Sequence, residues 1–163
     1  LYTQFPEKRI KKEHIKIGGK TKDELIQVLE QKGVYLSDDT RDMLNNSDFQ
    51  TLRETEDATI ICLTVADLKF EHCPTMDEIF QRAQELGLEL CPAETGPQYK
   101  LQYTEQPAGE WLYVGMKPLN TSNGRLASFV LGDFWLGRFW MSLDKRSNSG
   151  DKFAFRLRRP SES

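Results

Sequence analysis

The sequence predicts an α+β fold in which two or three helices pack on an antiparallel sheet of about five to six strands. Capping boxes followed by apolar residues at helical spacing occur in the first half of the 163-residue chain. From Gln98 onward the apolar pattern changes to a period of two, which is typical of strands. We expect residues 18–160 to form a single module, residues 1–17 to be a tail or linker, and the chain to be a fragment of a larger protein.

Two capping boxes predict the two clearest helices. Thr21, followed three residues later by Glu24, begins a helix over about 22–32. Thr75 with Glu78 begins another over about 76–86. In both cases apolar residues recur on one face and a glycine follows the last turn, so each helix has a predicted beginning and end.

The remaining elements follow from shorter signals. Ser37 can cap a short helix over 38–45. The run TIICLTV at 59–65 is β-branched and apolar on both faces, so we expect a strand at the centre of a sheet that is covered on both sides. Alternating apolar residues from 98 to 158 predict an antiparallel meander of about five strands.

Charge and hydropathy narrow the classes of partner. The net charge of −3 and the pI near 5.5 argue against long nucleic acid, and no apolar run reaches the roughly 18 residues of a membrane span. Residues 1–112 carry 13 Lys/Arg and 21 Asp/Glu, whereas residues 113–160 carry 9 Lys/Arg and 3 Asp. This division favours an anion-facing surface in the last third; alternatively, the two parts attract each other or solvate their own faces.

The three cysteines, Cys62, Cys73 and Cys91, are an odd number without the spacing of a disulfide framework or a zinc site. We therefore expect free thiols, with Cys62 buried on its strand, and neither a metal nor a cofactor. This cysteine usage favours a reducing, cytoplasmic compartment, or the host cytosol if the parent protein is a secreted effector.

Enzyme signatures are missing from the sequence, so we expect no catalytic residues. The string GGKT lacks the earlier glycine and the preceding strand of a phosphate-binding loop, and there is no G-x-S-x-G elbow. Most paired carboxylates lie at helix starts or in loops, where capping and solvation explain them. Glu94 and Glu110, in the proline-rich stretch, are the acids that merit a test.

A candidate ligand site emerges from the alternating strands. If Leu112, Phe139 and Phe153 face the core, aromatic and arginine side chains collect on the opposite face of the sheet. Such a face can stack a planar base and pair its phosphates. The alternatives are that helices or a partner cover this face, or that arginine stems lie over tryptophan rings as ordinary packing. With Tyr103 added to this face, the candidate ligand-binding residues are seven: Tyr103, Trp111, Tyr113, Arg138, Trp140, Arg156 and Arg158.

The stretch LGLELCPAETGPQYKLQYTEQPAGEWL, followed by the closing FAFRLRR, resembles a bacterial accessory module with the pattern LGLELCPAE-x-GP…QY-x-QP-x-GEWL. It is similar to the KLAMP domains of secreted bacterial effectors, a resemblance that implies adenine-nucleotide binding. Tyr103 stands in the LQY element, and Glu110 and Trp111 stand in GEWL. Lys100 replaces an arginine of the pattern, which keeps the charge but loses the bidentate fork.

Two functions follow from these observations. The first is a non-enzymatic module that binds an adenine nucleotide or a similar phosphate-bearing ligand within a larger bacterial, effector-like protein. The second is a protein–protein interaction domain that uses the same aromatic and basic sheet face. Binding assays with nucleotides distinguish the two functions, because a bound nucleotide stabilises the fold only if the first function is correct.

Overall fold

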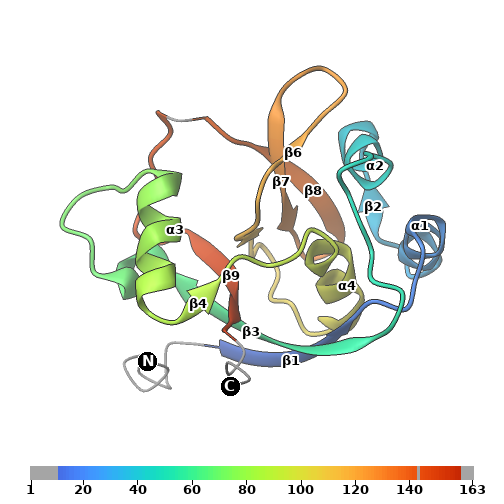
Figure 1. The fold of residues 1–163 in the computed structure, drawn as a ribbon, viewed down its shortest axis with the longest axis horizontal. Helices are drawn as coiled ribbons and strands as arrows, with labels where there is room; N and C mark the ends of the chain where they lie inside the picture. The colour runs from blue at the N-terminus through green and yellow to red at the C-terminus, as the bar shows by residue number, and fades with distance from the viewer. Residues whose placement is uncertain (1–10, 143, 159–163) are drawn as a thin grey trace.

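The computed structural model describes residues 11–142 and 144–158. Within these residues the chain forms four α-helices and one mixed sheet of nine strands (Figure 1). The helices are α1 (Lys22–Gln31), α2 (Asp38–Leu44), α3 (Met76–Glu85) and α4 (Thr95–Gln102), with a short 3-10 helix at Val65–Leu68. The strands are β1 (Lys11–Ile17), β2 (Tyr35–Leu36), β3 (Glu56–Thr64), β4 (Leu88–Glu89), β5 (Leu112–Val114), β6 (Leu119–Asn120), β7 (Leu126–Leu131), β8 (Trp135–Trp140) and β9 (Lys152–Leu157).

The first three helices confirm the capping predictions. The Thr21 hydroxyl accepts from the Glu24 backbone N–H at the start of α1, and both halves of the capping box are formed. The same reciprocal arrangement joins Thr75 and Glu78 at the start of α3. Ser37 accepts from the backbone of α2 in its first turn. Each cap satisfies a backbone donor that the helix itself leaves unpaired.

The α+β class is confirmed, but the sheet is larger than expected and is not purely antiparallel. The main strand order is β1-β3-β9-β5-β7-β8-β2, while β4 pairs with β9 and β6 pairs with β7. The pairs β5–β9 and β2–β8 are parallel. The last strand, β9, lies between β3 and β5, so the expected meander over 98–158 is wrong. Alternation along each strand carries no information about which strands become neighbours.

The segment expected to begin the meander is instead helix α4. Residues Thr95 to Leu101 are all buried, because α4 lies inside the molecule between β1, α1 and the sheet. A helix enclosed on all sides lacks a polar face, so its apolar residues show no 3.6-residue period. Pro97 sits in its first turn, where a proline is tolerated.

Part of the expected tail is a strand. Residues 11–17 form β1, which pairs antiparallel with β3 along its whole length, from Lys11 opposite Cys62 to Ile17 opposite Glu56. Residues 1–10 lie outside the described residues. β1 is the first strand of the path and carries mostly charged side chains, as is common at sheet edges, and this composition resembles that of a solvated tail.

Both faces of β3 are covered, as its sequence predicts. Ile60 and Cys62 belong to the core cluster that includes α1, α2 and α4, whereas Ile61 and Leu63 belong to the cluster that includes α3. In Figure 1, α3 accordingly lies on one side of β9, and α4 lies on the other side with α1 and α2 beyond it. β3 is the second strand of the path and not its centre.

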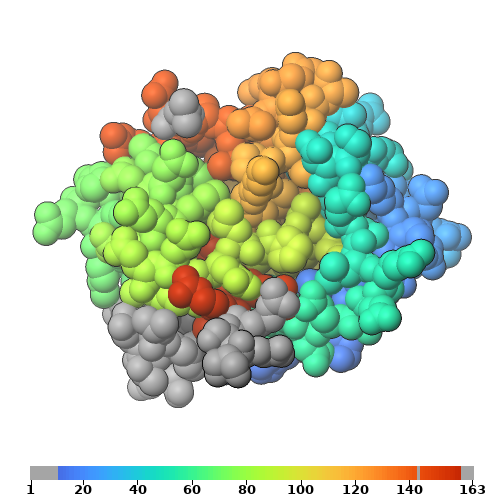
Figure 2. All heavy atoms as spheres, viewed as in Figure 1, coloured from blue at the N-terminus to red at the C-terminus, as the bar shows by residue number. Residues whose placement is uncertain are grey.

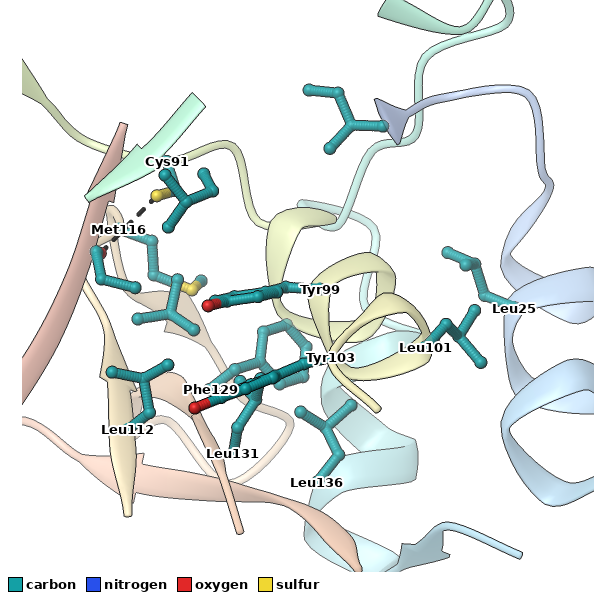
Figure 3. Close-up of a cluster of buried hydrophobic side chains, with 14 of the residues drawn as sticks. Leu25, Cys91, Tyr99, Leu101, Tyr103, Leu112, Met116, Phe129, Leu131 and Leu136 are labelled. Carbon is teal, nitrogen blue, oxygen red and sulfur yellow. Dashed lines mark hydrogen bonds between the residues drawn. The ribbon is translucent and has the colours of Figure 1, made fainter. Parts of the chain in front are cut away.

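The packing of α4 organises the larger core. The rings of Tyr99 and Tyr103 stack with centroids 5.0 Å apart, and both project from α4 towards the sheet, where Leu112 and Phe129 lie (Figure 3). Just before the helix, the carboxylate of Glu94 is 1% exposed and accepts two backbone N–H groups from distant loops. These contacts hold α4 against the face of the sheet.

Candidate functional site

The strand register divides the expected ligand face between two sides of the sheet. Leu112 lies opposite Leu131, and Leu131 lies opposite Leu136. Since side chains on neighbouring strands share a face when their residues are paired, Arg138 and Trp140 lie on the side of Leu112, towards α1, α2 and α4. The expectation of a single aromatic and basic face is therefore wrong.

Trp111 and Tyr113 belong to the other side of the sheet, the side of α3. The Tyr113 ring is 4.9 Å from the Phe139 ring and 5.4 Å from the Phe153 ring, so it is held between aromatic neighbours. Trp111 is 56% exposed. Of Tyr113 and Trp111, only Trp111 therefore presents an exposed ring to an incoming ligand.

The two C-terminal arginines make contacts within the chain. Arg156 is 2% exposed and donates to the Glu56 carboxylate at 3.3 Å and to the Asp57 carbonyl at 3.2 Å. Arg158 is exposed and donates to the Gln84 carbonyl at 2.9 Å. The Arg156 guanidinium thus belongs to a buried ion pair with Glu56. Breaking this pair to contact a ligand would cost free energy, because it would leave a buried charge without its partner.

Tyr103 is also enclosed. Tyr99 stacks on it, the Lys11 ammonium lies 3.8 Å from its ring centroid, and its hydroxyl donates to Glu110 at 3.0 Å. Burial raises the pKa of Tyr103. A cavity of about 80 Å³ adjoins these groups and is also lined by Cys62 and Lys152, the second of which pairs with Glu110 at 3.0 Å. Lys11 pairs with Glu13 at 3.2 Å, so the charged groups of the cavity already have partners within the chain.

Arg138 and Trp140 are neighbours, as predicted. The Arg138 guanidinium lies 4.4 Å from the Trp140 ring centroid, and the Arg125 guanidinium lies 4.1 Å from it. Arg138 also donates to Asp39 at 3.1 Å. This arrangement matches the alternative interpretation in which arginine stems pack on a tryptophan ring.

An exposed group of aromatic side chains lies at one end of the sheet, and we call Tyr35, Trp111, Phe134 and Trp135 the aromatic shelf. Tyr35 is paired with Trp135 between β2 and β8, and its backbone N–H donates to the Phe134 carbonyl at 3.0 Å. Continuing the β5–β7 register by one residue places Trp111 opposite Gly132, whose N–H donates to the Trp135 carbonyl at 2.9 Å. A row of neighbouring positions therefore runs from Tyr35 in β2 through Trp135 in β8 to Gly132, which follows β7, and Trp111, which precedes β5.

The shelf is open to solvent. Tyr35 is 63%, Trp111 56% and Phe134 66% exposed. Among the described residues, these are three of the five large hydrophobic side chains that are exposed. Single exposed apolar residues are common on protein surfaces. Here the Trp111 and Trp135 rings are in contact and Tyr35 is paired with Trp135 on the neighbouring strand, and such grouping indicates a contact surface.

Two glycines allow the Trp135 ring to lie against the sheet. A Cβ added at Gly132 would be 1.9 Å from the Trp135 ring, and one added at Gly137 would be 2.6 Å from it. The Trp111 ring stands nearly perpendicular to the Trp135 ring, at 85° and with centroids 5.3 Å apart. The Trp135 ring thus lies along the sheet, and the Trp111 ring stands beside it at nearly a right angle.

Lys100 supports the backbone beneath the shelf. Its ammonium is buried and donates to the carbonyls of Gly132 and Asp133 at 2.5 and 2.9 Å, and to the Gln106 side chain at 2.9 Å. All three of its N–H donors therefore have acceptors. Burial lowers the pKa of Lys100. Lys100, the residue that replaces an arginine of the motif, therefore stabilises the fold.

Sequence reasoning identified Trp111 and missed Tyr35, Phe134 and Trp135. A signal for Trp135 exists, because it lies two residues before Gly137 and four before Phe139 and so shares their face of β8. Tyr35 comes from a two-residue strand and carries no periodic signal. Its place beside Trp135 depends on pairing between segments 100 residues apart.

A second hollow separates α3 from the β6–β7 hairpin. This groove has a volume of about 380 Å³ and lies between the green surface of α3 and the orange surface of the hairpin (Figure 2). Its lining is mainly apolar, with three polar residues, Asp77, Lys117 and Ser142, among its walls. The apolar lining residues are Met76, Phe80, Leu90, Pro118, Leu126 and Met141.

Comparison with known proteins found no matching family model, no matching curated protein and no matching solved structure. The resemblance to the accessory module therefore rests on its motifs alone. Within the described ranges, no helix is long and apolar enough to cross a membrane, and no three His, Cys, Asp or Glu side chains converge to hold a metal ion.

Proposed function

We propose that this chain is a non-enzymatic recognition domain that binds another protein through the aromatic shelf. The observation that carries the proposal is the contiguous row formed by Tyr35, Trp135 and Trp111, in which two rings are more than half exposed and a third lies flat on the sheet. Tryptophan and tyrosine are the residues that most often carry the binding energy of protein interfaces. Exposing such rings to water has a free-energy cost that a partner removes.

The rigidity of the shelf supports the same function. The Trp135 ring is confined by Gly132, Gly137 and Trp111, and Lys100 clamps the turn that carries it. A surface that is already ordered loses little conformational entropy on binding. Among the other candidate residues, Arg156 is held in a buried ion pair, and Tyr103 contacts Glu110, which also pairs with Lys152. These side chains stabilise the fold.

The test is selection of binding peptides from a random display library on the immobilised domain. We expect enriched peptides to bind the parent domain and to bind the Trp111→Ala variant at least about tenfold more weakly. Leu52→Ala is the matched control, because Leu52 is also a large exposed side chain, at 39%, but lies in the loop between α2 and β3, where its carbonyl accepts the Gly19 N–H. Enriched peptides that bind both variants like the parent would contradict the proposal.

Adenine-nucleotide binding is the second candidate function, supported by the motif resemblance and by the Trp140 ring with Arg125 and Arg138 beside it. Thermal unfolding with ATP, ADP and AMP tests it, since a ligand at a hundred times its Kd stabilises the fold by about 2.7 kcal/mol. The Trp140→Ala variant should lose that stabilisation. If none of the nucleotides shifts the transition of the parent domain, this second candidate fails.

A further inference from the structure

We infer that the groove between α3 and the β6–β7 hairpin (Figure 2) binds a small apolar molecule with an anionic head group, such as an alkyl carboxylate. This site is separate from the aromatic shelf, so the inference goes beyond the proposed recognition function. Three features of the groove support it: its size and apolar lining, the hydrogen bonds that hold its walls, and the ammonium of Lys117.

The size of the groove suits a small molecule. Its volume of about 380 Å³ lies within the roughly 300–1,000 Å³ that is typical of ligand-binding clefts. A sphere of that volume has a cross-section of roughly 60 Å², far below the ~800 Å² that each partner buries in a standard protein interface. The groove therefore holds one small ligand, whereas most of a protein partner would lie outside it.

Apolar side chains line both walls of the groove. Met76 and Phe80 lie one turn apart on α3 and therefore project to the same side of the helix. Leu126, which begins β7, and Met141, which follows β8, line the wall on the side of the hairpin. Leu126 is 46% exposed, so a ligand in the groove removes apolar surface from water. That removal is the main source of affinity for an apolar molecule.

Hydrogen bonds hold the walls of the groove in place. The Met141 N–H donates to the Leu126 carbonyl at 2.9 Å. The Cys91 N–H donates to the Gly115 carbonyl at 2.7 Å, which joins the segment after β4 to the segment after β5. The capping box at Thr75 fixes the start of α3. Because the groove is already formed, a ligand that enters it orders few protein groups and loses little affinity to conformational entropy.

Lys117 supplies a donor for an anionic head group. Its side chain is exposed, and within residues 11–142 and 144–158 its ammonium forms no ion pair or hydrogen bond. Asp48 lines an adjoining hollow that Lys117 also borders, but the two side chains do not pair. The Ser142 hydroxyl also lines the groove, and it has no hydrogen-bond partner in the same ranges. A carboxylate in the groove accepts hydrogen bonds and therefore matches both donors.

Asp77, the acidic residue of the groove, already has its charge stabilised. It is the second residue of α3, where the backbone N–H groups and the dipole of the helix start favour a negative charge. A cationic ligand beside Asp77 would compete with these groups and would also be repelled by Lys117. The charge of the groove that lacks local compensation is therefore the positive one, and it favours an anionic ligand.

The probes are alkyl carboxylates of increasing chain length, from hexanoate to decanoate, and calorimetry measures their binding to the parent domain. Burial of one methylene group raises affinity by up to about fourfold, so the Kd should fall along the series until the chain fills the groove. We expect decanoate to bind with a Kd below about 1 mM. Decylamine, which has the same chain and the opposite charge, should bind at least about twofold more weakly.

Four variants separate the apolar wall from the charge. Leu126→Asp places a carboxylate in the apolar wall at a half-exposed position and should weaken decanoate binding at least about tenfold. Leu52→Asp makes the same change at an exposed leucine in the α2–β3 loop and should leave binding unchanged. Lys117→Met should weaken binding about two- to fivefold and remove the preference over decylamine, because an exposed pair contributes little. Asp77→Asn should not weaken it, and circular dichroism shows whether each variant is folded.

Three results would overturn the inference: no binding of any carboxylate, decanoate binding that Leu126→Asp leaves unchanged in a folded variant, or decylamine binding as tight as that of decanoate. If the peptides selected on the immobilised domain lose binding in Leu126→Asp, the groove belongs to a protein partner, which also overturns it. The proposed recognition function is judged separately by Trp111→Ala, which should leave decanoate binding unchanged.

Discussion

The buried carboxylate of Glu94 is expected to be a major stabilising contact of this fold. It is 1% exposed and accepts the Gly18 N–H at 3.0 Å and the Leu52 N–H at 2.8 Å, and so joins two loops to the start of α4. Glu94→Ala removes the acceptor and leaves the buried Gly18 N–H and the partly buried Leu52 N–H unpaired. Each such loss costs about 1–3 kcal/mol, so the variant should lose roughly 3–5 kcal/mol of unfolding free energy.

Urea unfolding measures this loss. For a small domain with a slope of about 1–3 kcal/mol per M, a change of this size moves the midpoint by more than about 1 M while the slope stays the same. Glu94→Gln keeps one acceptor oxygen and should lie between the parent and the alanine variant. Glu105→Ala is the control, because Glu105 is an exposed glutamate beyond the end of α4. A loss below about 1 kcal/mol in Glu94→Ala would refute the assigned role.

Further predictions concern the thiols, the cap of α3 and the support of the shelf. In the folded protein Cys73, which is exposed, should react with an alkylating reagent far faster than Cys62, because burial raises the pKa of the Cys62 thiol to about 12; mass spectrometry of labelled peptides measures this, and equal rates would contradict it. The hydrogen bond from the Thr75 backbone and the bond to the His72 ring lower the pKa of Glu78 to about 2, from an ordinary 4.5, so its stabilising contribution is complete above pH 4.5 and is lost as the pH falls through 2. An NMR titration of that carboxylate should show this midpoint. Lys100→Met should lower stability by about 1–3 kcal/mol in urea unfolding and shift the fluorescence of the shelf, since the carbonyls of the β7–β8 turn lose their donor.

The face on which a side chain lies was the feature hardest to predict. Alternation within β5 and within β8 was correct for each strand taken separately. The error arose in combining them, because Leu112 shares its face with Leu136 and Arg138 and not with Phe139. A shift of one residue in register moves every side chain of a strand to the other side. That register depends on pairing through β7, which no local pattern specifies.

The sequence by itself determined the elements whose hydrogen bonds are local. The capping boxes of α1 and α3 join residues three apart, and the apolar run of β3 requires cover on both faces wherever it lies. Tertiary structure decided the rest: the insertion of β9 between β3 and β5, the enclosure of α4 and the meeting of Tyr35, Trp135 and Trp111. These features depend on contacts between residues far apart in the chain, whose free energy is gained only when the whole core assembles.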